Sequence, residues 1–267
     1  MNKADTTIQE LLDIMARLRD PVQGCPWDKS QTFESIIPHT LEETYEVIDA
    51  IERAEPQDIK VELGDLLLQI LFYCQIGKEK SWFDFHDVVS ALEEKLIRRH
   101  PHIFSDEKMH NTAEEQHNLW EALKEKERQK KQQSTPGVLA DIPKNLPALV
   151  RAQKLQARAA RVGFDWPHIR FVLDKIQEEI KEFEESYTQN DKMALEEELG
   201  DILFVCANLA RHIKSDAETI LRRANDKFER RFSGVENRVN KSGQSWEMFT
   251  LEELDQFWDE VKIEEKK

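Results

Sequence analysis

Acidic residues in two short motifs are the strongest candidates for chemistry in this chain of 267 residues. The motifs Glu-Glu-x-x-Glu and Glu-Leu-Gly-Asp each supply two acids at i,i+3 spacing, which places both members of a pair on one face of a helix. The midpoint between the two pairs is Ala54, where the composition favours a turn. We therefore expect two antiparallel helices that bring four carboxylates together. These four, the N-terminal quartet, are Glu43, Glu46, Glu62 and Asp65.

The same two motifs recur later in the chain with the same spacing, and Asn190 in a turn-forming stretch lies midway between them. Three further motifs repeat in the same order, so the chain consists of two tandem copies of one helical module. These motifs are Trp27-Asp28 and Phe164-Asp165, Lys95-x-x-Arg98-Arg99 and Lys227-x-x-Arg230-Arg231, and Trp120 and Trp258. The second set of acids, the C-terminal quartet, is Glu179, Glu182, Glu198 and Asp201.

The segments that follow the quartets, 66–76 and 202–210, are apolar on nearly every side, which predicts buried helices with acids that point into a bundle. Four facing carboxylates repel one another or take up protons, and a hard divalent cation resolves the conflict. Oxygen ligands suit Mg²⁺, with Mn²⁺ as the alternative. The competing interpretations are that lysines neutralise these acids across the bundle, or that the acids are surface residues at i,i+4 spacing. An iron site is disfavoured because neither quartet contains histidine, and the pairs Glu107–His110 and Glu114–His117 lie in a polar stretch.

The elements that position these acids are helices. Long segments are rich in Glu, Leu, Lys, Ala and Gln, apolar residues recur every three or four positions, and glycines number only 8. We predict an all-α protein with two homologous helical-bundle domains, 1–127 and 148–267. A charged and proline-containing linker, 128–147, joins them.

Composition excludes several classes of protein. The net charge of −15 opposes binding of nucleic acid through the overall field. The longest apolar run, 202–207, is too short for a membrane span, and the N-terminus does not have the pattern of a signal peptide. Cys25, Cys74 and Cys206 fit neither a disulfide framework nor a zinc site, and we expect the last two to lie in the core. The sequence thus predicts a cytoplasmic protein without nucleic-acid or membrane partners.

Cations and aromatic side chains close to the end of each copy could hold a phosphorylated ligand. Metal sites with open coordination positions commonly carry phosphates, and arginine offers a bidentate fork. The alternative is that these cations only balance nearby glutamates. The repeated Trp258 and Trp120 could stack on a base or pack internally. The candidate cations are Lys227, Arg230 and Arg231 in the second copy and Lys95, Arg98 and Arg99 in the first.

The order of these motifs, present twice over nearly the whole chain, resembles the MazG family of bacterial nucleoside triphosphate pyrophosphohydrolases. The resemblance implies the all-α NTP pyrophosphatase fold, a homodimer, and Mg²⁺-dependent hydrolysis of an NTP to NMP and diphosphate. It also implies a role in nucleotide-pool clearance or in stress response. The alternative from a different class is a non-catalytic dimeric helical scaffold that binds partner proteins.

The resemblance also assigns roles to residues, with the C-terminal copy as the main catalytic one. The C-terminal quartet, Glu179, Glu182, Glu198 and Asp201, would bind Mg²⁺, and water would attack the α-phosphorus. Substrate contacts would come from Lys175, Glu178, Lys227, Arg230, Arg231 and Trp258. Ala194 occupies a place where some members carry a nucleotide-contacting lysine. A second site would use Glu43, Glu46, Glu62 and Asp65 with Lys95, Arg98 and Arg99.

Overall fold

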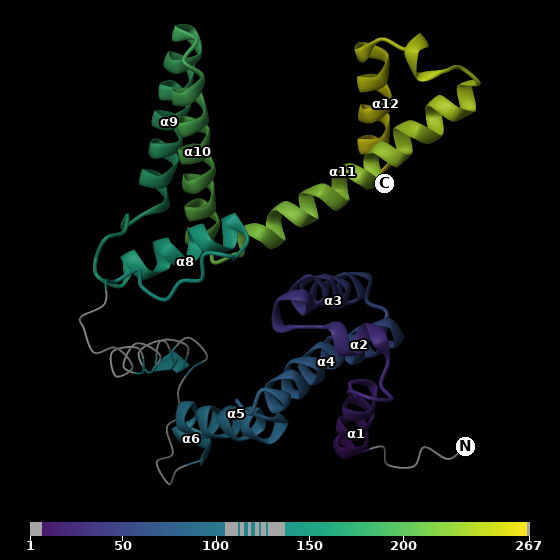
Figure 1. The fold of residues 1–267 in the computed structure, drawn as a ribbon. Coiled ribbons are helices and arrows are strands. Elements are labelled where there is room, and N and C mark those ends of the chain that lie inside the picture. Colours follow the sequence, from purple (N-terminus) through teal and green to yellow (C-terminus); the bar gives the residue numbers. More distant parts are fainter. Residues whose placement is uncertain are drawn as a thin grey trace. The chain divides into compact units, whose positions relative to one another are not determined.

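The computed structural model describes residues 7–104, 112, 115–116, 119–120, 123, 127 and 137–265. All regular structure in these ranges is helical, with no strand, which confirms the predicted all-α fold. The chain divides into two compact units, Met1–Glu127 and Arg128–Lys267 (Figure 1). The Glu107–His110 and Glu114–His117 pairs and linker residues 128–136 lie outside the described residues.

The N-terminal unit is built around a hairpin of two long helices, α3 and α4. Thr32 caps the start of α3 in a reciprocal capping box with Ser35. Ala54 ends the helix in the left-handed conformation, with φ 56° and ψ 37°. The turn therefore falls at the midpoint predicted from the acidic motifs. The helices of this unit are α1 (Ile8–Leu18), α2 (Pro26–Ser30), α3 (Phe33–Arg53), α4 (Pro56–Glu79), α5 (Phe85–Arg99) and α6 (Pro101–Phe104).

The core of this unit lies where α1, α3 and α4 meet. Large apolar side chains from all three helices are nearly or completely removed from solvent there. The partly buried Leu67 and Phe85 pack against this cluster. Its buried members are Met15 from α1, Ile36 from α3, and Leu71, Phe72 and Ile76 from α4.

The C-terminal unit repeats the hairpin, here with α9 and α10. Asn190 ends α9 in the left-handed conformation, with φ 56° and ψ 33°, and the Asp191 side chain caps the start of α10. The second midpoint prediction is thus also correct. The helices of this unit are α8 (Ala148–Ala160), α9 (Ile169–Gln189), α10 (Lys192–His212), α11 (Ala217–Ser242), the 3₁₀ turn η1 (Trp246–Met248) and α12 (Leu251–Glu264).

Small side chains form the core beneath this second hairpin. Ala152 of α8 packs against Ala207 and Ala210 of α10 and Ala217 of α11. The α12 helix packs on the long α11, and a Cβ atom added to Gly234 would lie 2.7 Å from a methyl group of Val261. The absence of a side chain at this position therefore permits the close approach of α11 and α12.

Two expectations about burial are wrong for the single chain. Cys74 is buried, but Cys206 is exposed. The helices predicted to be buried all round keep exposed apolar positions, such as Ile70 on α4 and Leu203 on α10, which are 40% and 53% exposed. The physical reason is that a two-helix hairpin covers only one side of each helix. Within the described ranges, no helix combines the length and apolar character required to traverse a lipid bilayer.

Candidate functional site

The C-terminal quartet converges at the facing surfaces of α9 and α10. One carboxylate oxygen from each of Glu179, Glu182 and Glu198 lies within 4.8 Å of the others. Asp201, one turn further along α10, interacts electrostatically with Glu198. Glu179 is the buried member, whereas Glu182 and Asp201 are exposed. The helical hairpin thus places acids from both of its arms around one point, as their spacing predicts.

Lys175 is the one described cation that forms an ion pair with this quartet. Its Nζ lies 2.8 Å from Oε1 of Glu179 and also 2.8 Å from Oε1 of Glu178. These two interactions raise the pKa of Lys175. A single ammonium group therefore faces four carboxylates, which leaves most of the quartet's negative charge uncompensated.

The electrostatics of the quartet show this imbalance. Desolvation, followed by the neighbouring charge of Glu179, raises the pKa of Glu182. Desolvation and the charges of Glu182, Glu179 and Asp201 raise the pKa of Glu198. In each case burial and then the close neighbouring charges disfavour the ionised form of the carboxyl group. A divalent cation would reverse this preference, and hard cations favour ligand sets made only of oxygen atoms.

The N-terminal quartet forms a similar cluster between α3 and α4. One carboxylate oxygen from each of Glu43, Glu62 and Asp65 lies within 4.8 Å of the others. Desolvation and the charges of Glu46 and Asp65 raise the pKa of Glu43 and of Glu62. The amide of Gln69 donates to Glu43 at 3.4 Å. The first copy therefore also has the carboxylates that a metal site requires.

The two copies differ in the residue one turn before the first acid of the site. Lys175 in the second copy corresponds to His39 in the first, and Nδ1 of His39 lies 3.8 Å from Glu42. The fixed cation beside the C-terminal quartet is thus replaced in the first copy by a group that is charged only when protonated.

The predicted phosphate-binding arginines are paired with one glutamate in each copy. Nε of Arg230 and Nε of Arg231 lie 2.9 and 2.8 Å from the two carboxylate oxygens of Glu265. Hydrogen bonds from Arg231 and then Arg230 lower the pKa of Glu265. In the single chain these two cations therefore balance a nearby acid, and their predicted contact with phosphate stays a prediction.

The corresponding glutamate in the first copy is Glu127. It lies 2.9 Å from Nε of Arg98 and 2.5 Å from Nη2 of Arg99. Hydrogen bonding to Arg99 and Arg98 lowers its pKa to about 2. Neither Glu127 nor Glu265 was predicted, although both follow the repeated tryptophan by seven residues, and this shared spacing could have identified them. Lys95 is exposed.

Trp258 packs on α11 within the chain. Its ring centroid lies 5.3 Å from that of Phe228, and the Arg231 guanidinium carbon lies 5.9 Å from the Trp258 ring centroid. Lys227 is exposed on the same helix. The first turn of α11 lies at the foot of the hairpin, and Lys227 lies about 15 Å from the start of α11 along its axis at 1.5 Å per residue.

Glu198 lies about 20 Å from that foot along α10, by the same helical rise. In Figure 1, α11 diverges from the hairpin. The quartet, Lys175 and Glu178 are therefore brought together, whereas Lys227, Arg230, Arg231 and Trp258 form a second group away from them in the single chain.

Comparison with known proteins identifies the same two repeated segments. The family model described as the MazG nucleotide pyrophosphohydrolase domain matches residues 31–104 and again 170–235, the two segments that carry the quartets. A protein of Escherichia coli (strain K12), named nucleoside triphosphate pyrophosphohydrolase, is 50% identical over 97% of this chain and 98% of its own length.

A protein of Thermotoga maritima named nucleoside triphosphate pyrophosphohydrolase/pyrophosphatase MazG is 42% identical over 98% of both chains. A nucleoside triphosphate pyrophosphohydrolase of Mycobacterium tuberculosis is 36% identical over 58% of this chain and 46% of its own length. Two matched segments and identity along nearly the full length confirm the resemblance seen in the motifs. The chain belongs to the MazG nucleotide pyrophosphohydrolase family, in the form that carries the domain twice.

Proposed function

We propose that this chain is a Mg²⁺-dependent nucleoside triphosphate pyrophosphohydrolase, which converts an NTP and water to NMP and diphosphate at the C-terminal quartet. The observation that carries the proposal is the cluster of Glu179, Glu182 and Glu198 oxygens within 4.8 Å of one another. The names of the relatives support the reaction, and family membership favours an enzyme over a scaffold.

The residues present fit a divalent cation. Oxygen ligands from two helices converge, and desolvation followed by neighbouring negative charge raises the pKa values of Glu182 and Glu198, an effect that a bound cation would offset. Bound Mg²⁺ would supply charge neutralisation for the phosphates and a water of lowered pKa. Mn²⁺ has the same preference for oxygen and is the expected substitute.

Two residues beside the quartet have roles that follow from their contacts. Glu178 is exposed and accepts a hydrogen bond from Lys175 at 2.8 Å, and its position beside the quartet makes it the candidate acceptor for the proton of the attacking water. Lys175 has its ammonium group beside the carboxylates, where it can also attract a phosphate oxygen. Positive charge on this side of the quartet would offset the charge of the departing diphosphate.

We further propose that the protein acts as a homodimer, through the exposed apolar face of the hairpin. Leu199 and Leu203 on α10 are 48% and 53% exposed, and Ile180 on α9 is 43% exposed. An apolar stripe on a two-helix hairpin is typically buried against further helices. A second copy could cover this stripe and could bring its own Arg230 and Arg231 toward the quartet, which the single chain does not do.

The test is incubation of the full chain with Mg²⁺ and a panel of NTPs and dNTPs, followed by identification of the products. NMP and diphosphate are expected. A nucleoside diphosphate with phosphate would indicate a different hydrolase. No turnover of any member of the panel would favour the scaffold. We expect the N-terminal quartet to contribute less or to act on another nucleotide, so Glu43→Gln should reduce turnover less than Glu179→Gln.

A further inference from the structure

The stretch between Asp141 and Asp165 contains no aspartate or glutamate, although acids make up 53 of the 267 residues of the chain. The same stretch, 142–164, contains several cations, most of them on α8 or at its end. A local surplus of positive charge attracts an anionic partner even where the whole molecule is acidic. The cations are Lys144, Arg151, Lys154, Arg158 and Arg161.

The cations of α8 and its C-cap lie on the side of the helix that faces away from the core. Their spacing of three, four and three residues places them on one face, which extends about 15 Å along the helix axis. The opposite face carries Ala152 and Gln156, which are buried against α10. We call this set the basic stripe; its members are Arg151, Lys154, Arg158 and Arg161.

Two members of the basic stripe, Arg151 and Lys154, form no ion pair with a described residue. Lys154 is exposed, whereas Arg151 is half-buried. The Nε atom of Arg151 is buried and has no hydrogen-bond acceptor within the described ranges. A buried N–H group without an acceptor is costly, so a partner that supplies one is favoured. A carboxylate is a suitable acceptor because it also matches the charge of the guanidinium group.

An exposed apolar surface adjoins the basic stripe. Nη1 of Arg158 donates to the backbone carbonyls of Val138 and Ala140 at 3.3 and 3.2 Å, which holds this segment beside α8. Val138, Leu139 and Phe164 are all exposed, Phe164 to 82%. Apolar and aromatic side chains grouped on a surface, with charged residues around them, are typical of a contact with another protein.

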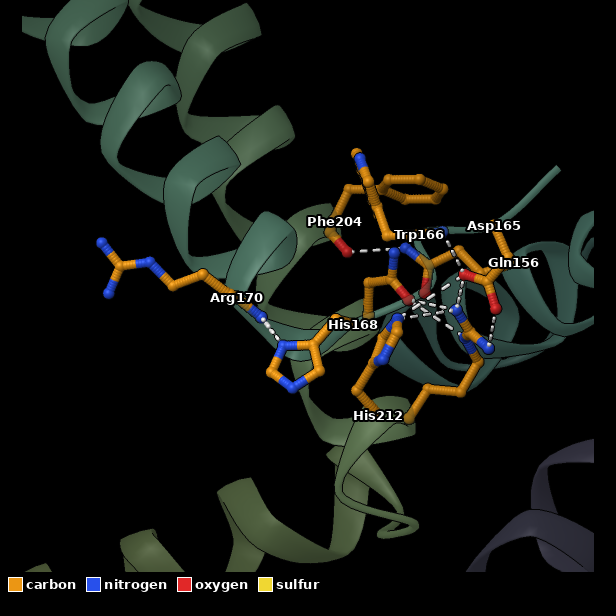
Figure 2. Close-up of polar contacts among 9 residues, drawn as sticks. Gln156, Asp165, Trp166, His168, Arg170, Phe204 and His212 are labelled. Carbon is orange, nitrogen blue, oxygen red and sulfur yellow. Dashed lines mark hydrogen bonds and ion pairs between the residues drawn. The ribbon is translucent and has the colours of Figure 1, made fainter.

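A cavity of about 470 Å³ opens beside this apolar surface. Leu155 and Ala159 of α8 line it, and Trp166 and Phe204 supply aromatic walls. Gln156 also lines the cavity and is 7% exposed; its Nε2 donates to the backbone carbonyl of Phe204 at 2.7 Å (Figure 2). Its Oε1 has no hydrogen-bond partner among the described residues. The cavity therefore suits a large apolar side chain that has one N–H or O–H group.

The charged groups at the cavity are paired with each other. Nη1 of Arg211 lies 3.0 Å from Oδ2 of Asp165, and Nε of Arg211 donates to Oδ1 of Asn208 at 3.0 Å. Nε2 of His212 lies 3.5 Å from Oδ1 of Asp165. An anionic group would thus find uncompensated positive charge at the basic stripe, whereas the cavity favours an uncharged group.

The first copy of the module has a different charge at the corresponding helix, α1. This helix packs on α4 as α8 packs on α10. It carries Glu10 and Asp13 together with Arg17, so it has no surplus of positive charge. The fold of the module therefore does not require a basic helix at this place, and the basic stripe is explained better by binding than by folding.

We propose that the basic stripe and the adjoining cavity form a docking surface for an acidic segment of a partner protein that carries a tryptophan or tyrosine. Carboxylates of the segment would pair with Arg151 and Lys154, and its aromatic side chain would donate to Oε1 of Gln156 in the cavity. Glutamates one helical turn apart are separated by about 5–6 Å, which matches the spacing along the stripe. The net charge of −15 disfavours an extended polyanion, such as a nucleic acid or an anionic membrane.

The test is binding of a labelled synthetic peptide, in which glutamates flank one tryptophan, to the full chain, measured by fluorescence anisotropy. We expect saturable binding that weakens as salt concentration rises. Lys154→Glu should weaken binding at least about tenfold, because it replaces an attraction by a repulsion at an exposed position. Replacement of the tryptophan of the peptide by alanine should weaken it by a similar factor. Lys241→Glu, at an exposed lysine near the end of α11, is the matched control and should change binding less than about twofold.

Binding of no peptide, equal binding by the wild type and Lys154→Glu, or equal binding of the tryptophan and alanine peptides would overturn the docking surface. Tighter binding of a single-stranded oligonucleotide or of phosphatidylserine vesicles, lost in Lys154→Glu, would assign the stripe to a different class of partner. A change in the sedimentation of Lys154→Glu without peptide would assign it to contact between copies of this chain. Turnover of NTPs by this variant should equal that of the wild type. A wild-type chain that binds the peptide but hydrolyses no NTP would refute the proposed function alone.

Discussion

Replacement of Glu179 by glutamine removes one charge from the most buried position of the C-terminal quartet. The Glu179 side chain is 6% exposed and its Oε1 lies 2.8 Å from Nζ of Lys175. Lys175 keeps its second bond to Glu178, so the variant leaves no unpaired buried cation. The lost i,i+4 pair is worth about 1 kcal/mol or less, and relief of repulsion with Glu182 and Glu198 opposes the loss.

Glu179→Gln should change the stability of the fold much more when Mg²⁺ is present. A ligand at 100 times its Kd stabilises the folded state by about 2.7 kcal/mol. For a unit of this size, that corresponds to a rise in Tm of about 5–10 °C. The wild type should show such a rise and Glu179→Gln should not. Turnover should fall at least about 100-fold, since metal stabilisation of the transition state is worth several kcal/mol.

Thermal unfolding with and without Mg²⁺, followed by circular dichroism, measures the first effect, and product formation measures the second. Glu185→Gln is the matched control, because Glu185 is exposed on the same helix and, within the described part of the chain, its ion-pair partner is Lys181 alone, at 3.7 Å. If Glu179→Gln retained both the Mg²⁺-dependent rise in Tm and turnover close to that of the wild type, Glu179 would not belong to a metal site.

Three further predictions concern the arginines, the hairpin face and pH. Glu265→Gln frees Arg230 and Arg231 for phosphate, so KM for NTPs should fall roughly two- to fivefold in steady-state kinetics; an unchanged KM would separate these arginines from the substrate. Leu203→Arg should weaken self-association at least about tenfold in sedimentation experiments, and an unaltered dimer would place the interface elsewhere. The raised pKa values in the C-terminal quartet stabilise the fold at pH below the ordinary value of 4.5, and this contribution is lost as pH rises through the folded values. In thermal unfolding, the stability of the metal-free protein should therefore fall from pH 4.5 upward. The stabilisation by Mg²⁺ should grow over the same range, because only ionised carboxylates bind metal. Stabilisation by Mg²⁺ that does not depend on pH would contradict the assignment of these carboxylates as metal ligands.

The helical hairpins could be predicted because their determinants are local. Spacing of the acids fixed their common face, and the turns at Ala54 and Asn190 followed from the midpoint between the motifs. Capping by Thr32 and Asp191 then sets where the helices begin. Helical periodicity and an antiparallel helical hairpin are enough to predict that Glu179, Glu182 and Glu198 converge.

The partners of the cations could not be predicted in the same way. Arg230 and Arg231 meet Glu265 only because α12 returns along α11, a contact that depends on packing at Gly234. Lys175 is closer to prediction, since its pairing with Glu179 is an i,i+4 relation within one helix. Long-range packing therefore limits prediction of the phosphate-binding group, whereas local spacing suffices for the quartet.

The buried side of each apolar helix was the second feature that could not be predicted from the sequence. Apolar composition alone indicated that 202–210 is enclosed, yet Cys206 is exposed and Ala207 is buried in the same helix. Which side of a uniformly apolar helix meets its neighbours depends on the partner helix, here α8 with its small Ala152. The exposed side is the face that we propose to be covered in the dimer.

We propose that the C-terminal quartet supports attack of water on the α-phosphorus of an NTP. Hydrolysis of ATP by the full chain with Mg²⁺ in water enriched in ¹⁸O, followed by mass spectrometry of both products, tests it most directly. We expect one ¹⁸O atom in AMP and none in diphosphate. Label in the diphosphate, or release of ADP and phosphate, would contradict it.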